Sequence, residues 1–382
     1  MKIGIITVHN GQNYGASLQA YALIQLLKKM GHEANLIDYR TKKIEDRMQS
    51  YKELSRWDSI KNIKKNLRYF SSNVFFGTKT HSVKVADTFL KFHEKIFESE
   101  YRTYRDANEL YTLNKTYDVF ICGSDQIWNP IITGLDDAFF LSFASTEKNT
   151  VAYAPSLGME SERVDEQMKN VLKEKLRSVK HLSVREANNC KLVEEITGRR
   201  CATVVDPVLL LQKDEWLKLI INEELIYPKG KYAFYYPVVE QKEMENFAIQ
   251  ECKKRGWHLV NPRLVPAYAK LRKYTCFSGK PVGPTEFLSL LAGAQAVFTN
   301  SFHATVFSSV FQKELVIIPL KGKHAARNNR IFEYLKMLNF GGEYTSKKII
   351  HLNGIEFENV DKFLNIERLK SIEYLRNALN NV

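Results

Sequence analysis

The sequence predicts an α/β protein built from two Rossmann-like domains that face each other across a cleft. Short apolar runs alternate with amphipathic helical segments in two successive series, an order typical of parallel sheets with right-handed crossovers. The chain has 382 residues, 44% of them hydrophobic, which is more than one core ordinarily organises. In such folds ligands bind at the carboxyl ends of the strands, so we expect the functional residues there.

The first domain is predicted over residues 1–207. It opens with a strand at 3–8, a glycine-containing loop, a helix in which leucines recur at helical spacing from Leu18 to Leu27, and a strand at 34–38. After an insertion at about 42–115, strands are expected at 118–122, 149–154, 181–184 and 202–205, with helices at 162–178 and 186–196. The turn at Asp206-Pro207 ends this series.

The second domain is predicted over residues 208–382. Its expected strands are 232–236, 257–260, 296–299 and 315–318, and its expected helices are 240–255, 284–291 and 302–311. The tail is predicted to hold a helix at 330–338, a strand near 348–352 and a terminal helix from about 366. This last helix could cross back to the first domain.

The charge of the chain predicts an anionic partner. Lys and Arg number 56 against 43 Asp and Glu, and residues 42–95 alone hold 13 basic and 6 acidic side chains. The insertion, with Lys61, Lys64, Lys65 and Arg68 among aromatic residues, is predicted to be a solvated helical cover over the first sheet. The alternative is docking on an anionic membrane that presents a polyprenyl-diphosphate-linked acceptor. Nucleic acid is not expected as a partner, because no known recognition motif is present.

The sequence favours a cytoplasmic protein, with peripheral contact at the inner face of the membrane as the further option. No apolar stretch is long enough to span a bilayer, and the N-terminal segment lacks the features of a signal peptide. The 5 cysteines include no CxxC pair and indicate reduced thiols. We expect neither a metal site nor a cofactor.

Polar residues follow the predicted strand at 296–299. The turn at Asn300-Ser301 would leave free N–H groups at a helix N-terminus, which favours a phosphate or a carboxylate, and His303 would lie in the first helical turn beside that anion. The alternative is that Ser301 is only an N-cap and His303 a core or surface histidine. Spacing alone does not decide between these readings.

Residues after other predicted strands also allow both a functional and a structural interpretation. The loop before Gly15 could cradle an anion, but it lacks the dinucleotide-binding fingerprint, so NAD is disfavoured. Asp125 could act on a sugar hydroxyl, although a turn role is favoured locally. Trp128 could pack beneath its loop or stack on a sugar ring.

Five segments together resemble the polysaccharide pyruvyl transferase family. They are Asn-Tyr-Gly-Ala-Ser-Leu-Gln-Ala at 13–20, Gly-Ser-Asp-Gln-Ile-Trp-Asn at 123–129, Val-Ala-Tyr-Ala-Pro-Ser-Leu-Gly at 151–158, Ser-Val-Arg-Glu at 183–186 with Val-Asp-Pro at 205–207, and Thr-Asn-Ser-Phe-His-Ala-Thr-Val-Phe-Ser at 299–308. The matches occur in the order of the family and span about residues 1–320.

The resemblance implies a fold similar to GT-B glycosyltransferases, phosphoenolpyruvate as co-substrate, and a sugar of a cell-surface polysaccharide or its lipid-linked precursor as acceptor. The product would be a pyruvate ketal. His303 matches the family histidine near the donor and is our candidate general acid or base, and Arg185 matches a family arginine and is our candidate donor clamp. Arg185 could instead be an ion-pair partner of Glu186 or Asp206. We expect donor contacts from Asn300, Ser301, Phe302, Arg327 and Arg330, and acceptor contacts from Asn13, Tyr14, Gly15, Ser124, Asp125, Gln126 and Trp128.

One departure from the family pattern matters. Relatives have Arg-Leu-His where this chain has Ser301-Phe302-His303, so an expected donor arginine is missing. Either Arg327 or Arg330 replaces it, or the donor or the reaction differs. The alternatives are a GT-B glycosyltransferase that uses a nucleotide sugar and a non-catalytic binding protein of polysaccharide biosynthesis.

Overall fold

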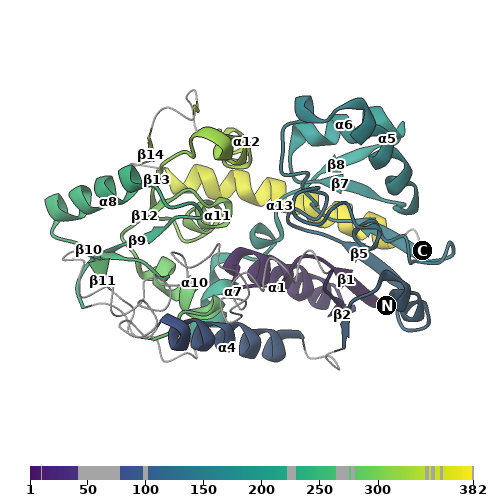
Figure 1. Cartoon of the computed structure of the whole chain (residues 1–382), viewed down its shortest axis with the longest axis horizontal. Coiled ribbons are helices and arrows are strands. Elements are labelled where there is room, and N and C mark those ends of the chain that lie inside the picture. The colour runs from purple at the N-terminus through teal and green to yellow at the C-terminus, as the bar shows by residue number, and fades with distance from the viewer. Residues whose placement is uncertain are drawn as a thin grey trace, which may run out of the picture.

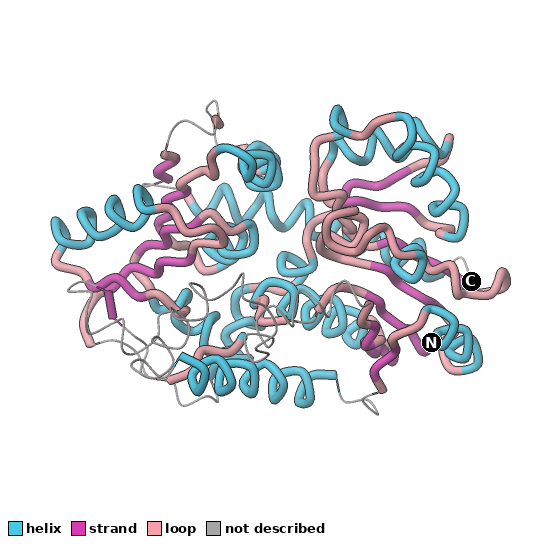
Figure 2. The backbone as a smooth tube through the Cα atoms, viewed as in Figure 1, coloured by secondary structure: helices cyan, strands magenta, loops and turns pink. Residues whose placement is uncertain are grey.

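The structure is a computed structural model that describes residues 1–9, 11–41, 78–97, 102–221, 229–263, 275–276, 280–339, 344–345, 349–352 and 356–380. Two α/β halves lie beside each other, each with its own main sheet (Figures 1 and 2). Most of the basic insertion, including Lys61, Lys64, Lys65 and Arg68, lies outside the described residues.

The first half is built on a parallel sheet, as predicted. Its strand order is β2 (Glu33–Leu36), β1 (Lys2–Ile6), β5 (Val119–Cys122) and β6 (Asn149–Ala152). A bridge between Val151 and His181 extends this sheet toward the parallel pair β7 (Leu182–Val184) and β8 (Cys201–Thr203). The helices of this half are α1 (Tyr14–Lys29), α5 (Glu166–Lys175) and α6 (Ala187–Thr197).

The second half has a larger sheet. Its strand order is β11 (Thr275–Cys276), β10 (His258–Val260), β9 (Tyr232–Tyr236), β12 (Ala296–Thr299), β13 (Glu314–Ile317) and β14 (Ile350–Leu352). All of these pairs are parallel except β13 with β14, which is antiparallel. The helices are α8 (Lys242–Arg255), α10 (Pro284–Gly293), α11 (Phe302–Val310) and α12 (Asn329–Met337).

Alternation along the strands divides the core. On β5, Val119 and Ile121 face one apolar cluster and Phe120 and Cys122 face another, as the period of two in a strand requires. On β9 the odd and even positions divide in the same way. One cluster receives a face from both sheets, so the two halves share a continuous apolar core between them.

The described part of the insertion is only partly helical. Helix α4 (Thr78–Phe97) buries Phe89 and Phe92, exposes Lys84 and Lys91, and lies against α1 and α10. Residues beyond it form the short strand β4 (Thr103–Tyr104), paired with β3 (Asp38–Tyr39), and the 3₁₀ helix η2 (Ala107–Lys115). The prediction of a helix through to 115 is therefore wrong at β4, because the extended backbone there pairs with a strand that is distant in the sequence.

The terminal helix α13 (Phe357–Asn380) begins earlier than the predicted residue 366, since Val360 and Leu364 already face the core. It extends from one half to the other (Figure 1). On the first half, Asn149 donates to the carbonyl of Ala378 at 2.6 Å and Ser371 accepts from the N–H of Val205 at 3.0 Å.

Two further elements, η6 (Pro207–Leu210) and α7 (Lys213–Ile221), follow the first half in the sequence. Helix α7 was not predicted. Element η6 contacts α1, and α7 contacts α10, so the domain boundary at 207–208 stays a prediction. In the described part of the chain, no helix combines the length and the apolar character needed to cross a membrane.

Candidate active site

The candidate site lies where the carboxyl ends of strands from both sheets meet. Asp125 follows β5, Arg185 follows β7 and Asp206 comes three residues after the end of β8. His303 lies in the first turn of α11, directly after β12. The parallel topology thus brings together residues that are far apart in the sequence, as the rule for open α/β sheets predicts.

His303 is held at the contact between the two halves. It is only 8% exposed. A Cβ atom added to Gly15 would lie 2.1 Å from its Nδ1 atom, so the start of α1 can approach the ring only because residue 15 is a glycine. On the other side, His303 Nε2 lies 3.6 Å from Asp206 Oδ2, beyond hydrogen-bond distance.

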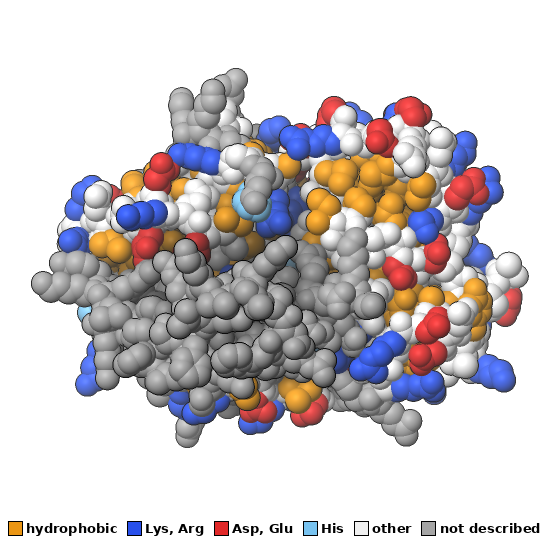
Figure 3. Space-filling view, in the orientation of Figure 1, with side chains coloured by type: hydrophobic (Ala, Val, Ile, Leu, Met, Phe, Trp, Pro, Cys, Tyr) orange, Lys and Arg blue, Asp and Glu red, His pale blue; other side chains and the backbone are white. Residues whose placement is uncertain are grey.

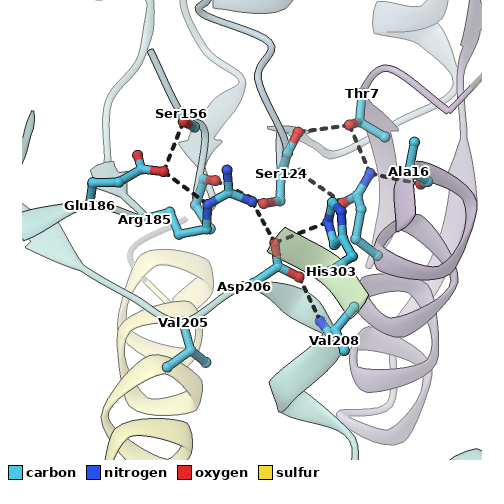
Figure 4. A network of polar contacts seen from close by, with 12 residues as sticks. Thr7, Ala16, Ser124, Ser156, Arg185, Glu186, Val205, Asp206, Val208 and His303 are labelled. Carbon is cyan, nitrogen blue, oxygen red and sulfur yellow. Dashed lines mark hydrogen bonds and ion pairs between the residues drawn. The ribbon is translucent and has the colours of Figure 1, made fainter. Parts of the chain in front are cut away.

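Asp206 is the centre of a buried network (Figure 4). Its Oδ2 accepts from Arg185 Nη1 at 2.7 Å, and its Oδ1 accepts from the N–H of Val208 at 3.0 Å. Burial by itself would raise the pKa of Asp206, but the charges of His303 and Arg185 and the Val208 hydrogen bond outweigh it and hold this pKa well below the usual range. The carboxylate is therefore ionised at neutral pH.

Arg185 pairs with Glu186 as well as with Asp206. Its Nε donates to Glu186 Oε1 at 3.1 Å, and Ser156 donates to the same oxygen at 2.9 Å. Its guanidinium lies 4.3 Å from the centre of the Phe302 ring. The ion-pair alternative for Arg185 is thus observed, yet among the described residues its buried Nη2 atom has no hydrogen-bond partner.

Arg330 approaches the same ring from α12. Its guanidinium lies 5.7 Å from the centre of the Phe302 ring, and its buried Nε atom finds no partner among the described residues. Burial, and then the charge of Arg185, lower the pKa of Arg330 to about 10. Arg327, in the 3₁₀ helix η7 (Gly322–Asn328), is half-buried and lowers it further.

Buried polar atoms without a partner therefore gather at this site. In the described part of the chain, these atoms include Asp125 Oδ1, Arg185 Nη2, His303 Nε2 and Arg330 Nε. The residues that carry them also interact electrostatically with one another or with Asp206. Buried donors and acceptors are nearly always satisfied in folded proteins, and each exception calls for an explanation. Anionic oxygens on a ligand would accept from the two arginines, and a ligand hydroxyl would donate to Asp125 Oδ1.

Two donor-binding candidates have structural roles. Ser301 caps α11 by accepting from the N–H of Ala304 at 3.4 Å. Asn300 accepts from the N–H of Val238 at 2.6 Å and donates to the carbonyl of Val239 at 2.9 Å. The amide of Asn300 therefore fastens the loop after β9, and its contact with the donor stays a prediction.

The predicted acceptor residues divide in a similar way. Trp128 is fully buried, stacks on Phe140 with ring centres 5.4 Å apart and donates to the carbonyl of Phe139 at 3.1 Å, so stacking on a sugar is excluded. Ser124 is fully buried and donates to the carbonyl of Ala154 at 2.8 Å. Both are scaffold residues, because packing satisfies their polar atoms internally.

Three further predicted acceptor residues also make contacts within the protein. Tyr14 is buried, stacks on Phe287 with ring centres 4.4 Å apart and donates to the carbonyl of Val282 at 3.1 Å, so it anchors the first half to the second. Asn13 is exposed and caps α1 through the N–H of Ala16. Gln126 is half-buried and accepts from Asn129 at 2.9 Å.

Sequence reasoning did not select Asp206 as a site residue. A signal was present, since an aspartate at a strand end before Pro207 belongs to one of the family-like segments. Its closeness to His303 could not be read from the sequence, because the two residues belong to different halves.

An open pocket of about 390 Å³ lies in the second half. It is lined by Val239, Glu240, Gln241, Lys242, Glu243, Leu320, Lys321 and His324. Lys321 pairs with Glu243 at 2.6 Å. Where the second half meets the first on this face, Lys or Arg side chains and a histidine reach the surface (Figure 3).

In the part of the chain that the structure describes, no group of three or more His, Cys, Asp and Glu side chains is placed to hold a metal ion. Cys122, Cys190, Cys201 and Cys252 are free thiols. The expectation that no cofactor is needed stays a prediction.

Residues 13–321 match the sequence model of the polysaccharide pyruvyl transferase family. The chain belongs to this family. It is therefore a transferase that acts in polysaccharide biosynthesis on a sugar acceptor. None of the curated proteins matches its sequence significantly.

Three solved structures are similar to this pyruvyl transferase family member. UDP-GlcNAc 2-epimerase from Methanocaldococcus jannaschii is similar, with a TM-score of 0.50, 11% identity and coverage of 100% of both chains. The UDP-GlcNAc 2-epimerase from Neisseria meningitidis matches with a TM-score of 0.45 and 12% identity over 97% of this chain and 100% of that one. The heptosyltransferase WaaC from E. coli matches with a TM-score of 0.38 and 11% identity over 96% and 100%. The first similarity shows the predicted GT-B fold.

Proposed function

We propose that the protein transfers a pyruvyl group from phosphoenolpyruvate to two hydroxyls of one sugar, in a cell-surface polysaccharide or its lipid-linked precursor, and so forms a pyruvate ketal. The observation that carries this proposal is the group of unpartnered buried atoms at the candidate site, with Arg185 Nη2 and Arg330 Nε among them. Leaving a buried donor unsatisfied costs about 1–3 kcal/mol, so these groups are suited to a ligand with anionic oxygens.

Phosphoenolpyruvate carries a carboxylate and a phosphate, and both bind well to guanidinium groups and to helix N-termini. We assign Arg330 to the role of the arginine that is missing at position 301. Its buried Nε atom has no partner among the described residues, whereas the Ser301 side chain is used as a helix cap. The N-terminus of α11 supplies further N–H groups beside His303.

The reaction balances without a further reactant. A proton adds to the methylene carbon of phosphoenolpyruvate, which becomes a methyl group, and the adjacent carbon becomes electrophilic. One sugar hydroxyl attacks that carbon, phosphate leaves with the electron pair of the C–O bond, and a second hydroxyl closes the ring. Of the two hydroxyl protons released, one replaces the proton added to carbon and the other leaves on phosphate.

In this proposal His303 delivers the proton and Asp125 orients the acceptor sugar. His303 is the acid that delivers the proton to the methylene carbon, a role that contributes on the order of 10²–10⁴-fold in rate. Asp125 contributes a buried Oδ1 atom, unpartnered among the described residues, that accepts a hydrogen bond from a sugar hydroxyl. The two residues come from different halves, so acid and acceptor contact meet only in the assembled fold.

The first test is thermal unfolding with phosphoenolpyruvate, pyruvate, UDP and GDP in turn. A ligand at about 100 times its Kd adds about 2.7 kcal/mol of stability, which shifts Tm measurably. Phosphoenolpyruvate is expected to shift Tm and the nucleotides are not. A panel of p-nitrophenyl glycosides then identifies an acceptor by phosphate release and by the mass of the pyruvyl product.

Other outcomes would overturn the proposal. A shift with a nucleotide alone would indicate a glycosyltransferase that uses a nucleotide sugar. A shift with phosphoenolpyruvate but no turnover with any glycoside would indicate a binding protein. No shift with any of the four ligands would remove the assigned donor.

A further inference from the structure

We infer that Asp206 is the positioning residue of this site: it fixes the imidazole of His303 for proton transfer, and Arg185 holds Asp206 in turn through Nη1, which leaves Nη2 for the donor. The part of this inference that concerns the reaction rests on the proposed function. The pairing of Asp206 with His303 is a property of the fold and can be tested without turnover.

Three contacts determine where the Asp206 carboxylate lies. Val208 N–H binds Oδ1 at 3.0 Å, Arg185 Nη1 binds Oδ2 at 2.7 Å, and His303 Nε2 faces the same Oδ2 at 3.6 Å (Figure 4). The residue is 2% exposed. With one oxygen bound by the backbone and the other by a guanidinium, the carboxylate cannot rotate away from the histidine without losing a hydrogen bond.

His303 is confined from the opposite side as well. Gly15 touches the ring near Nδ1, and the Phe302 ring lies edge-on with ring centres 5.3 Å apart. The gap of 3.6 Å to Asp206 is longer than a hydrogen bond, but catalytic hydrogen bonds are often long in the free enzyme and tighten when substrate binds. A shift of less than about 1 Å in the ring would close it.

Charge explains why a merely structural role is insufficient. Glu186 already pairs with Arg185 at 3.1 Å, so a second carboxylate is not needed to neutralise this arginine. Burying an additional carboxylate is unfavourable unless further polar groups satisfy it. Arg330 lies against the Phe302 ring, so the side chains that face Asp206 are Arg185 and His303.

Other titratable groups surround the pair. Asp125 and Glu186 contribute negative charge and Arg330 positive charge from neighbouring elements, and the buried hydroxyls of Tyr153 and Tyr334 lie near Asp206. A change of pH therefore alters several groups at once. For this reason the test relies on substitutions rather than on a pH profile.

The central experiment is a double-mutant cycle with Asp206→Asn and His303→Gln. Asp206→Asn keeps the size of the side chain and removes its charge. We expect kcat for transfer to the p-nitrophenyl glycoside found above to fall on the order of 10²–10⁴-fold, with KM for phosphoenolpyruvate changed by less than about threefold. If Asp206 acts through His303, the double variant is no slower than His303→Gln alone. Losses that multiply would overturn the inference.

Asp38→Asn is the matched control. Asp38 is another buried aspartate that faces a histidine and an arginine, His9 and Arg40, and it lies outside the site. This substitution is expected to lower stability and to leave kcat of the folded protein within about threefold. If Asp38→Asn lowers kcat as much as Asp206→Asn does, the effect at Asp206 is one of general stability and the inference fails.

A spectroscopic test covers the case in which Asp206→Asn does not fold. A buried imidazole N–H held by a carboxylate exchanges slowly with water and gives a downfield proton resonance. Proton NMR of the wild type with saturating phosphoenolpyruvate should show such a signal, because the 3.6 Å gap closes on binding, and the signal should be missing in His303→Gln. If the two spectra have the same downfield signals, Asp206 does not hold His303 and the inference is overturned. Because this readout needs no acceptor and no turnover, a wild type that shows the signal without transferase activity would refute the proposed function and leave this inference standing.

Discussion

Two buried histidine–aspartate pairs in this protein differ in how completely their hydrogen bonds are made. In the first pair, His9 Nε2 lies 3.0 Å from Asp38 Oδ1 and His9 Nδ1 lies 3.0 Å from the carbonyl of Thr7. Asp38 also accepts from Arg40 at 2.8 Å and from Thr103 at 2.7 Å. Every one of these contacts is at hydrogen-bond distance, so the network is closed.

The second pair, His303 with Asp206, is open. His303 Nε2 lies 3.6 Å from Asp206 Oδ2. In addition, Arg185 Nη2 and Arg330 Nε lack hydrogen-bond partners among the described residues. The comparison shows that a buried His–Asp–Arg arrangement is not by itself an active site. What marks the second pair is the group of unsatisfied polar atoms around it, which a closed structural network does not leave.

Replacing His303 and His9 one at a time should give the largest effects and should separate catalysis from stability. His303→Gln is expected to slow pyruvyl transfer on the order of 10²–10⁴-fold while Tm stays close to that of the wild type, because His303 Nε2 has no hydrogen-bond partner among the described residues. His9→Gln is expected to lower the free energy of unfolding by about 1–3 kcal/mol and to leave the rate nearly unchanged. Steady-state kinetics and urea unfolding check both. If His9→Gln slowed transfer and His303→Gln only lowered stability, our interpretation of the two pairs would be wrong.

Filling the space beside the open pair should reduce the rate on the order of 10²-fold. In Gly15→Ala the new Cβ atom would lie 2.1 Å from His303 Nδ1, so the ring must move. Gly31→Ala, at the other end of α1, is the control: its Cβ atom meets nothing within 4 Å, and only its φ of +86° resists the change. We expect Gly31→Ala to cost about 1–2 kcal/mol of stability and no activity. Equal activity of Gly15→Ala and wild type would show that the position of His303 is unimportant.

The two candidate replacements for the missing arginine can be ranked by donor affinity. A charge-assisted hydrogen bond is worth about 1.5–3 kcal/mol, so Arg330→Gln is expected to raise KM for phosphoenolpyruvate about 10- to 100-fold. Arg327→Gln, which changes a half-buried side chain on the preceding element, should raise it less. The melting-temperature shift with phosphoenolpyruvate gives an independent measure. A larger effect from Arg327→Gln would assign the donor to Arg327 instead.

The smallest expected effect is on the pH dependence of stability, and it comes from a histidine beside the His9–Asp38 pair. His93 on α4 shares a hydrogen bond of 2.9 Å with Ser17 and lies beside His9. Burial, and then the charge of His9, lower the pKa of His93 to about 3. In the unfolded chain a histidine has a pKa of about 6.5, so the stability that His93 contributes is complete above pH 6.5 and is lost as pH falls toward 3.

We therefore expect His93→Gln to reduce the slope of unfolding free energy against pH by up to about 1.4 kcal/mol per pH unit between pH 6 and 4. Urea unfolding across this range measures the slope. Phe89→Leu on the same helix is the control, since a non-titrating change lowers stability equally at every pH. An unchanged slope in His93→Gln would mean that this histidine is not buried in neutral form.

The sequence was sufficient for most of the main elements and for their order, but it missed α7 and β11. Apolar runs predicted β1, β5, β9 and β12 closely, because strands that are buried on both faces leave a continuous hydrophobic signal. It failed at β4 and at the start of α13, where pairing or packing against distant residues decides the local conformation. It also pointed to the strand ends as the place of the site, since parallel topology fixes which end collects the loops.

Within the site, the sequence by itself determined the residue types: a histidine at a helix start, arginines nearby, and a family pattern that names the class of reaction. Only the tertiary structure decided which of them can act. It closed Trp128, Ser124 and Asn300 into the scaffold and left Arg185, Arg330 and His303 with open hydrogen-bonding atoms. It also placed Asp206 opposite His303. The physical reason is that hydrogen-bond satisfaction depends on distances between residues that are far apart in the chain, and local sequence carries no information about those distances.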